Sequence, residues 1–159
     1  MIRPSIESDK SFLLTLFQEE GVLSGFPMTT PAEIEDSCNF WMDMALRGYG
    51  ITFEAKGQVA GMAVLYIPIY KKLSKAALFS IVVKDTFRRQ KIGSKLISTL
   101  EHIGKKMYGL SIIHLEVYEK NEAAISLYKN LGYTIYGVQE KFIKENGIYS
   151  NKVLMEKRI

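Results

Sequence analysis

Cysteine and histidine are scarce in this sequence of 159 residues. Cys38 is the only cysteine, so an intrachain disulfide is excluded. His102 and His114 are the only histidines, and together with one cysteine they cannot supply the ligands of a structural zinc site. We therefore expect a reducing compartment and a protein without a metal.

Long apolar runs are missing as well. No stretch approaches the roughly 18 apolar residues that a membrane-spanning helix needs, and the first residues, MIRPSIESDKS, contain no apolar core of a secretion signal. The chain also has no repeats, low-complexity segment or linker. A chain of 159 residues has the size of one domain, and 47% hydrophobic residues are enough for one core. We therefore expect a single cytoplasmic domain over residues 1–159, without a membrane partner.

The net charge of +4 arises in one region. Between Lys84 and Lys106 there are seven Lys or Arg residues and two acidic residues, so the surplus of five accounts for the whole imbalance. One basic turn suits a single polyphosphate group better than a nucleic-acid groove, which needs a wider basic stripe, usually with exposed aromatic residues. A nucleic-acid partner is therefore not expected.

Apolar periodicity and turn residues predict a mixed α/β fold. Thr30, Pro31 and Glu33 form a helix-start signature with Thr30 as the N-cap of a capping box. The expected strands are 2–4, 49–55, 58–67, 76–83, 111–117, 134–144 and 149–157, and the expected helices are 9–20, 31–45, 93–108 and 122–131. This order predicts about seven strands and about four helices, with antiparallel pairs on both flanks of a central parallel pair. Met107 is expected on the buried face of the third helix.

A basic turn joins the fourth strand to the third helix, and residues 84–91 are expected to lie outside the core. The strand ends in three apolar residues, Ile81, Val82 and Val83. The first N–H groups of a helix lack intrahelical partners, and the helix dipole is positive at that end. The turn is therefore a candidate anion site, with Arg88, Arg89 and Lys91 around it. The alternative interpretation is a solvated basic surface.

The turn resembles the acetyl-CoA pyrophosphate loop of the GCN5-related N-acetyltransferases (GNAT), which reads Gln or Arg, two residues, Gly, one residue, then Gly or Ala. The corresponding residues here are Arg88, Arg89, Gln90, Lys91, Ile92 and Gly93. Arg88 and Gly93 match the pattern, whereas Lys91 stands where the family usually has its first Gly. The resemblance implies that the pyrophosphate lies on the N–H groups from Gln90 to Ser94.

Residues 114–133 resemble a second signature of the same family, in which a strand ends in Glu-Val and is followed by Asn, Ala, Leu-Tyr, and Gly with an aromatic residue. The matching residues are Glu116, Val117, Asn121, Ala124, Leu127, Tyr128, Gly132 and Tyr133. The resemblance covers roughly residues 76–137 and implies the family's fold, in which two central strands splay apart around the pantetheine arm of acetyl-CoA. The resemblance also implies which residues bind the cofactor, namely Ile81, Val82, Val83, Arg88, Arg89, Gln90, Lys91, Ile92, Gly93, Ser94, Asn121, Ala124 and Tyr128.

The implied chemistry is acetyl transfer from a thioester to an amine. The amine attacks only when it is neutral, and an acid near the sulfur helps the thiolate to leave. Tyr128 is the expected acid, and the alternative role for its ring is packing on Leu131 and the sheet. Strand 76–83 offers no carboxylate, so Glu116 is the expected base. It precedes Tyr128 by twelve residues, as in ribosomal-protein alanine N-acetyltransferases.

Several alternatives stay open for the proton transfer. Glu116 could be an ordinary half-exposed strand residue, and ordered water alone could remove the amine proton. His114 shares a strand face with Glu116 and is a candidate member of a proton relay. Asn121 could be only a helix cap.

The sequence thus predicts an acetyl-CoA-dependent N-acetyltransferase that works by direct transfer in a ternary complex, without a metal. A CoA-binding sensor or scaffold without turnover is the alternative. The acceptor is a small-molecule amine or a protein or peptide amine, shaped by the loop 21–29 and by the closing hairpin near Ile148 and Tyr149. A homodimer is compatible with the sequence.

Overall fold

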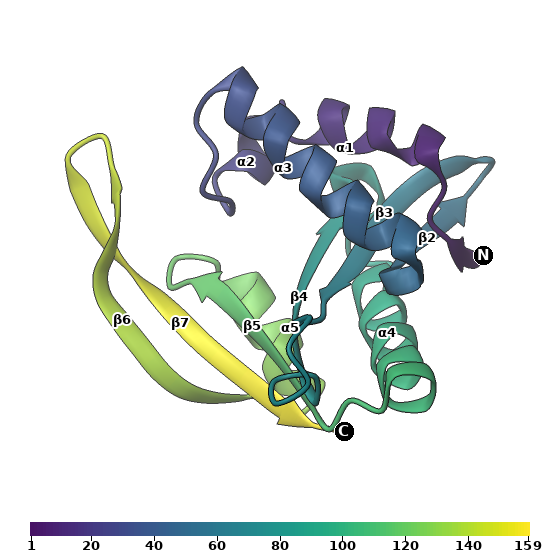
Figure 1. Ribbon diagram of the computed structural model, residues 1–159. Helices are drawn as coiled ribbons and strands as arrows, with labels where there is room; N and C mark the ends of the chain where they lie inside the picture. Colours follow the sequence, from purple (N-terminus) through teal and green to yellow (C-terminus); the bar gives the residue numbers. More distant parts are fainter.

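Helices cover both faces of a single seven-stranded sheet in the computed structural model, which describes all residues from 1 to 159 (Figure 1). The strands are β1 (Ile2–Pro4), β2 (Gly50–Ala55), β3 (Gln58–Tyr66), β4 (Ala76–Val83), β5 (Ile112–Tyr118), β6 (Thr134–Glu145) and β7 (Ile148–Arg158). The helices are α1 (Lys10–Leu16), α2 (Glu20–Leu23), α3 (Pro31–Met44), α4 (Ile92–Tyr108) and α5 (Glu122–Asn130). None of these helices combines the length and the apolar character needed to cross a membrane.

The sheet has the strand order β1-β2-β3-β4-β5-β7-β6. Its single parallel pair is β4 and β5, and all other neighbours are antiparallel. The parallel pairing covers only three positions, from Ala76 opposite Ile112 to Leu78 opposite His114. Beyond Leu78 the two strands separate, which confirms the mixed sheet with a splayed parallel pair.

The core is divided between the two faces of the sheet. On one face, α1 and α3 bury Leu13, Phe17 and Trp41 against β3 and β4. On the other face, α4 and α5 bury Leu96 and Tyr128 against β4, β5 and β7. This three-layer arrangement leaves the ends of β4 and β5 between two packed layers.

Local capping explains where several helices begin. The Thr30 hydroxyl accepts a hydrogen bond from the Glu33 amide at 3.3 Å, and the Glu33 carboxylate accepts one from the Thr30 amide at 3.0 Å. This confirms the capping box at the start of α3. In the same way, the Asn121 side chain accepts from the amide of Ala124 at 3.2 Å and caps α5.

The predicted helix 9–20 is wrong as a single element. Glu19 has an extended backbone, with φ −79° and ψ 120°, and divides the segment into α1 and the one-turn helix α2. The break lets Val22 turn back into the core layer that also buries Phe17. Five α-helices therefore replace the four expected ones.

Two expectations about burial are also wrong. Phe87 lies inside the basic turn, yet the residue is only 5% exposed, because it packs into the same core cluster as Ile92 and Leu96 of α4. Met107 follows the buried stripe of α4 but is 69% exposed. No other element therefore covers Met107 in the last turn of α4.

The β6–β7 hairpin extends well beyond the helical layers (Figure 1). It turns at Asn146 and Gly147, whose φ angles of 50° and 79° suit a two-residue turn between twisted strands. The pairing shifts twice along β6, the second time between Gln139 and Ile143. These irregularities bend the hairpin and aim side chains of β6 across β7.

Candidate functional site

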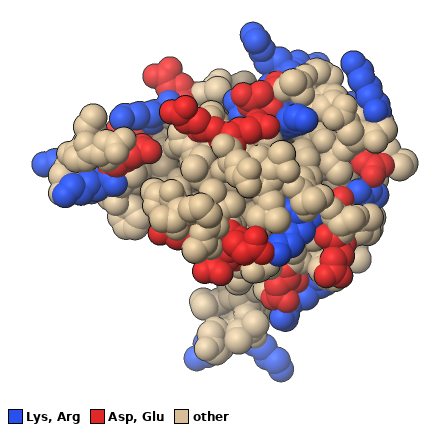
Figure 2. Space-filling model, turned by 90° about the horizontal axis from the view of Figure 1, so that it is seen from above, with Lys and Arg blue, Asp and Glu red and all other residues tan.

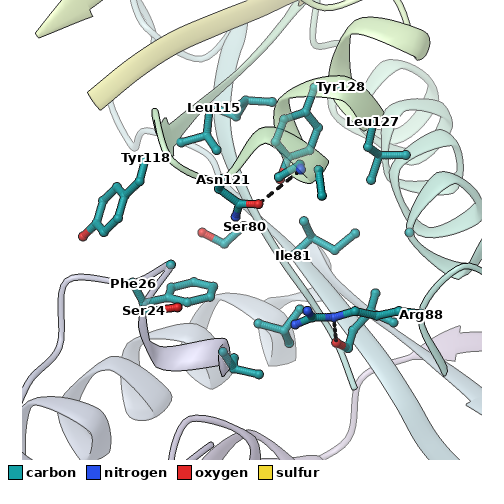
Figure 3. A pocket seen from close by; sticks show the side chains of 18 of the residues that line it. Ser24, Phe26, Ser80, Ile81, Arg88, Leu115, Tyr118, Asn121, Leu127 and Tyr128 are labelled. Carbon is teal, nitrogen blue, oxygen red and sulfur yellow. Dashed lines mark hydrogen bonds between the residues drawn. The ribbon is translucent and has the colours of Figure 1, made fainter. Parts of the chain in front are cut away.

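A cavity of about 800 Å³ opens where β4 and β5 separate. Its lining comes from the ends of both strands, the basic turn, the start of α4, and α5. Further residues come from the β6–β7 hairpin and from residues 21–26, which include part of α2 and the loop after it and are called the α2 segment below. Figure 3 shows Ser80 and Ile81 of β4, Leu115 of β5 and Tyr128 of α5 on one side of this space, with Phe26 opposite them. Segments far apart in the sequence thus meet at one hollow.

Nearly all the residues singled out in the sequence line this cavity. They are Ile81, Val82, Val83, Arg88, Arg89, Lys91, Ile92, Gly93, Ser94, Glu116, Asn121, Ala124 and Tyr128. Of the residues expected in cofactor binding or as acid and base, Gln90 alone is not part of the lining, and its side-chain amide donates to the carbonyl of Thr86 at 3.3 Å.

The basic turn has an unusual backbone at Lys91. This residue precedes the first residue of α4 and has a left-handed conformation, with φ 61° and ψ 14°. Residues with a Cβ atom rarely adopt this conformation, whereas glycine does so without strain. The geometry gives a physical reason for a glycine at this position, and Lys91 adopts the same conformation at a steric cost.

Gly93 allows α4 to approach α5 closely. A Cβ atom at this position would lie 3.2 Å from the Cδ2 atom of Leu127, closer than ordinary van der Waals contact. The first amide groups of α4 are therefore presented at the cavity without a side chain at position 93. Arg88 and Arg89 also line the cavity, so fixed positive charge surrounds these amides.

The end of β4 offers backbone groups to the cavity. From Phe79 to Val83 the strand pairs with β3 on one side but has no β5 partner on the other. Backbone N–H and C=O groups need hydrogen-bond partners when they are shielded from water. This strand edge can therefore accept an extended ligand as if it were another strand.

Tyr128 joins the cavity wall to the core. The residue is 8% exposed, and its ring makes edge-to-face contacts with Phe79 and Tyr133 at centroid distances of 5.7 and 6.1 Å. Burial raises the pKa of Tyr128 to about 12, so the hydroxyl stays protonated at neutral pH. The ring therefore packs on the sheet and also brings a proton donor to the cavity.

Glu116 reaches the cavity from the other face of the sheet. Leu115 and Val117 point into the core shared with α4 and α5, so the alternation of β5 places Glu116 on the opposite face. Its carboxylate accepts a hydrogen bond from the ammonium of Lys152 at 2.7 Å, and its side chain is 46% exposed. On the same face, burial lowers the pKa of His114, opposed by the negative charges of Glu116 and Glu156.

The sequence did not single out several residues at the cavity. The α2 segment contributes Ser24, Gly25 and Phe26, and a Cβ atom at Gly25 would lie 3.7 Å from the Asn121 amide nitrogen. Loop 21–29 was expected to shape an acceptor site. No local pattern in the sequence indicates that Gly25 lies close to Asn121, the cap of α5. Tyr118 was missed too, although it lies two residues after Glu116 and shares its strand face.

The closing hairpin contributes to the cavity at other positions than expected. Ile148 and Tyr149 do not line it, whereas Ile143, Glu145 and Ser150 do. Tyr149 faces the other side of the hairpin, because it pairs with Lys144, whereas Ile143 and Ser150 form the neighbouring pair.

Charge is unevenly distributed on the face in Figure 2. Acidic side chains lie on two sides of an uncharged central area, and several Lys and Arg side chains lie at the periphery. The net charge of +4 therefore does not produce a continuous basic surface on this face.

No group of three or more His, Cys, Asp or Glu side chains in the structure is arranged to hold a metal ion.

Comparisons with known proteins give a consistent result. The model of the acetyltransferase (GNAT) family matches residues 12–133. N-alpha-acetyltransferase 30 of Dictyostelium discoideum is 38% identical over 99 residues, which are 60% of this chain and 49% of that protein. A [ribosomal protein bS18]-alanine N-acetyltransferase of Escherichia coli is 35% identical over 78 residues, which are 48% of this chain and 49% of that protein. The chain thus spans about half the length of these relatives.

Two solved structures share the fold over more than nine-tenths of their length. The ribosomal-protein-alanine N-acetyltransferase of Brucella melitensis superposes with a TM-score of 0.86 at 20% identity, over 100% of this chain and 99% of that one. The protein yncA of Salmonella typhimurium, solved with its cofactor acetyl-CoA, superposes with a TM-score of 0.86 at 18% identity, over 99% and 92% of the two chains.

The left-handed backbone at Lys91 leads to a testable stability change. Lys91→Gly is expected to raise the free energy of unfolding by up to roughly 1 kcal/mol, because the steric cost of a Cβ atom is removed and part of the gain is lost to chain entropy. Lys91→Ala is the matched control, since it removes the same charge but keeps the Cβ atom. Urea unfolding followed by circular dichroism measures both variants, and an equal change in the two would contradict strain at this position.

Proposed function

Because the chain belongs to the acetyltransferase (GNAT) family, we propose that it transfers an acetyl group from acetyl-CoA to an amine. The observation that carries this proposal is the cavity between the separated ends of β4 and β5, which places the basic turn at the start of α4, Tyr128 and Glu116 around one space. The experiment that tests it measures thiol release from acetyl-CoA with a broad panel of amines. Thiol release that depends on the amine supports the proposal, and none with any amine contradicts it.

The residues at the start of α4 fit a pyrophosphate group. The amides of Ile92, Gly93 and Ser94 have no partners within the helix and lie at the positive end of its dipole. Arg88 and Arg89 line the same part of the cavity and add fixed positive charge. In the proposed complex, Lys91 extends outward to a phosphate, and its left-handed backbone turns the following amides toward the anion.

The free edge of β4 fits the extended arm of the cofactor. In the proposed complex, the backbone groups of Ile81, Val82 and Val83 pair with the amides of the pantetheine. The Val82 side chain is buried in the core while the backbone groups of β4 remain unpaired toward β5. Asn121 and Ala124 line the cavity beyond the end of β5 and border the other side of the arm.

When bound, acetyl-CoA supplies an activated acetyl group and a thiolate leaving group. Tyr128 donates its hydroxyl proton to the departing sulfur, which is consistent with a buried phenol that stays protonated at neutral pH. Glu116 accepts the proton of the amine, directly or through water, so that the nitrogen attacks in its neutral form. Both substrates are held together, so the acetyl group passes directly from sulfur to nitrogen.

The acceptor is a primary amine that approaches from the face carrying Glu116. Ser24 and Phe26 on the α2 segment, and Glu145 and Ser150 on the closing hairpin, line this part of the cavity. The relatives named above include a ribosomal-protein alanine N-acetyltransferase, which supports a peptide amino terminus as one acceptor class. Small-molecule amines form the other class in the panel.

A CoA-binding protein without turnover is the second candidate. The observation that favours it is the absence of a carboxylate on β4, which leaves Glu116 as the one acidic residue of the two central strands that lines the cavity. Tight CoA binding without amine-dependent thiol release would support this candidate and contradict the enzyme.

Gly93→Glu tests the placement of the pyrophosphate. The variant adds bulk and a negative charge beside the anion, so we expect CoA affinity to fall by at least about 10-fold in calorimetry. Ser98→Glu is the matched control, because it adds the same charge to an exposed position of α4 away from the turn. Unchanged CoA affinity in a folded Gly93→Glu variant would rule the placement out.

Tyr128→Phe tests the acid. The substitution keeps the ring and its contacts with Phe79 but removes the hydroxyl, so kcat should fall on the order of 100-fold while the KM for acetyl-CoA changes little. Tyr136→Phe removes a hydroxyl from an exposed tyrosine of β6 and should keep the wild-type kcat. A Tyr128→Phe variant with normal kcat would show that the residue has only a packing role.

Glu116→Gln tests the base. Glutamine keeps the shape but cannot accept the proton, so kcat/KM should fall by roughly 10-fold near neutral pH. The defect should shrink as pH rises, because more of the amine then arrives in its neutral form. Glu119→Gln is the matched control on an exposed residue outside the cavity. A defect of the same size at every pH would instead indicate a structural role, and near-normal turnover would give the base role to water.

A further inference from the structure

Lys152 on β7 is a buried lysine whose role the proposed chemistry does not explain. The residue is 8% exposed, and its ammonium donates a hydrogen bond to the carboxylate of Glu116 at 2.7 Å. An ammonium removed from water is costly unless a partner of opposite charge compensates it. Glu116 is the carboxylate that does so here.

The second irregularity of β6 builds the surroundings of this ammonium. Lys141 has a left-handed backbone with φ 51°, and its amide donates to the Asn151 side chain at 2.9 Å. The distorted segment places the ring of Phe142 over Lys152, with the ammonium 3.8 Å from the ring centroid. A cation at this distance from an aromatic face is attracted by it, so the ring helps to hold the lysine side chain in place.

The ammonium is directed at Glu116 rather than at a neighbouring neutral group. Gln139 lies directly opposite Lys152 in the β6–β7 pairing, and its side-chain oxygen is buried without a hydrogen-bond partner. The hydrogen bond of Lys152 instead crosses to β5 and fixes the Oε2 atom of Glu116. The Oε1 atom of the same carboxylate has no protein donor, and Glu116 lines the cavity.

We propose that Lys152 is a positioning residue, which holds the Oε2 atom of Glu116 so that Oε1 faces the incoming amine. This inference rests on the proposed function, because it concerns the residue proposed as the base. A carboxylate held at one oxygen by a fixed ammonium loses little orientational freedom when the amine arrives. Lys152 therefore acts on the reaction only through Glu116.

A double-mutant cycle tests this role. Lys152→Met keeps the volume but removes the charge, and kcat should fall roughly 10-fold while the KM for acetyl-CoA stays unchanged. Lys152→Arg restores a cation and should recover most of the loss. In a Glu116→Gln background, Lys152→Met should cause no further loss of kcat, because the residue that it positions is already inactive.

Two further variants keep the test decisive. Phe142→Leu removes the aromatic face from an exposed position and leaves the charges intact, so it should fold and lower kcat less than Lys152→Met does. Lys144→Met is the matched control, because Lys144 lies over the ring of Tyr149 on the same hairpin but has no carboxylate partner. Its kcat should equal that of the wild type. Thermal unfolding of every variant separates loss of fold from loss of catalysis.

The outcomes separate this inference from the proposed function. If the wild type acetylates an amine and Lys152→Met lowers kcat equally in the presence and absence of Glu116, the positioning role is overturned while the function stands. A normal kcat in Lys152→Met overturns it as well. If the wild type transfers no acetyl group to any amine, the proposed function fails and the inference fails with it.

Discussion

Three paired positions hold β4 and β5 together, and the cavity between the ends of these strands depends on the shortness of this contact. The separated ends do not collapse, because each strand has a complete partner on its other side. β3 pairs with β4 as far as Val83, and β7 pairs with β5 from Ile112 to Tyr118. The gap is therefore built into the pairing of the sheet, and a ligand placed in it would meet backbone groups already held in an extended geometry.

The basic turn works only because it is attached to this gap. Phe87 anchors the turn in the core, and Lys91 takes up a strained backbone immediately before α4. Strain of this kind persists where the surroundings fix the conformation, and here the strand before the turn and the helix after it do so. The result is a helix start that faces the open end of the gap, so a charged group and an extended arm can be held in one continuous site.

Local signals explain why much of the fold and site could be predicted from the sequence. Caps, turns and apolar alternation act over a few residues, and they placed β4, the cap at Thr30 and the turn before α4 correctly. Features decided by packing between distant segments were missed, such as the break at Glu19. The same holds for the pair of Glu116 and Lys152, which are 36 residues apart and meet because β7 pairs with β5 and places Lys152 opposite Tyr118, two residues from Glu116. No pattern of neighbouring residues in the sequence indicates that contact.

The proposed acid and base lie on different faces of the sheet, and this separation has a chemical consequence. Tyr128 belongs to the dry core between the sheet and α5, whereas Glu116 lies on the half-exposed face with His114. In the proposed reaction, one proton leaves the amine on the side open to solvent, and another reaches the thiolate on the buried side. If Tyr128 donated a hydrogen bond to Glu116, its hydroxyl proton would not be available to the thiolate. The sheet keeps them apart, and both line the gap between β4 and β5, so in the proposed reaction Tyr128 serves the sulfur and Glu116 serves the amine on either side of one reacting carbon.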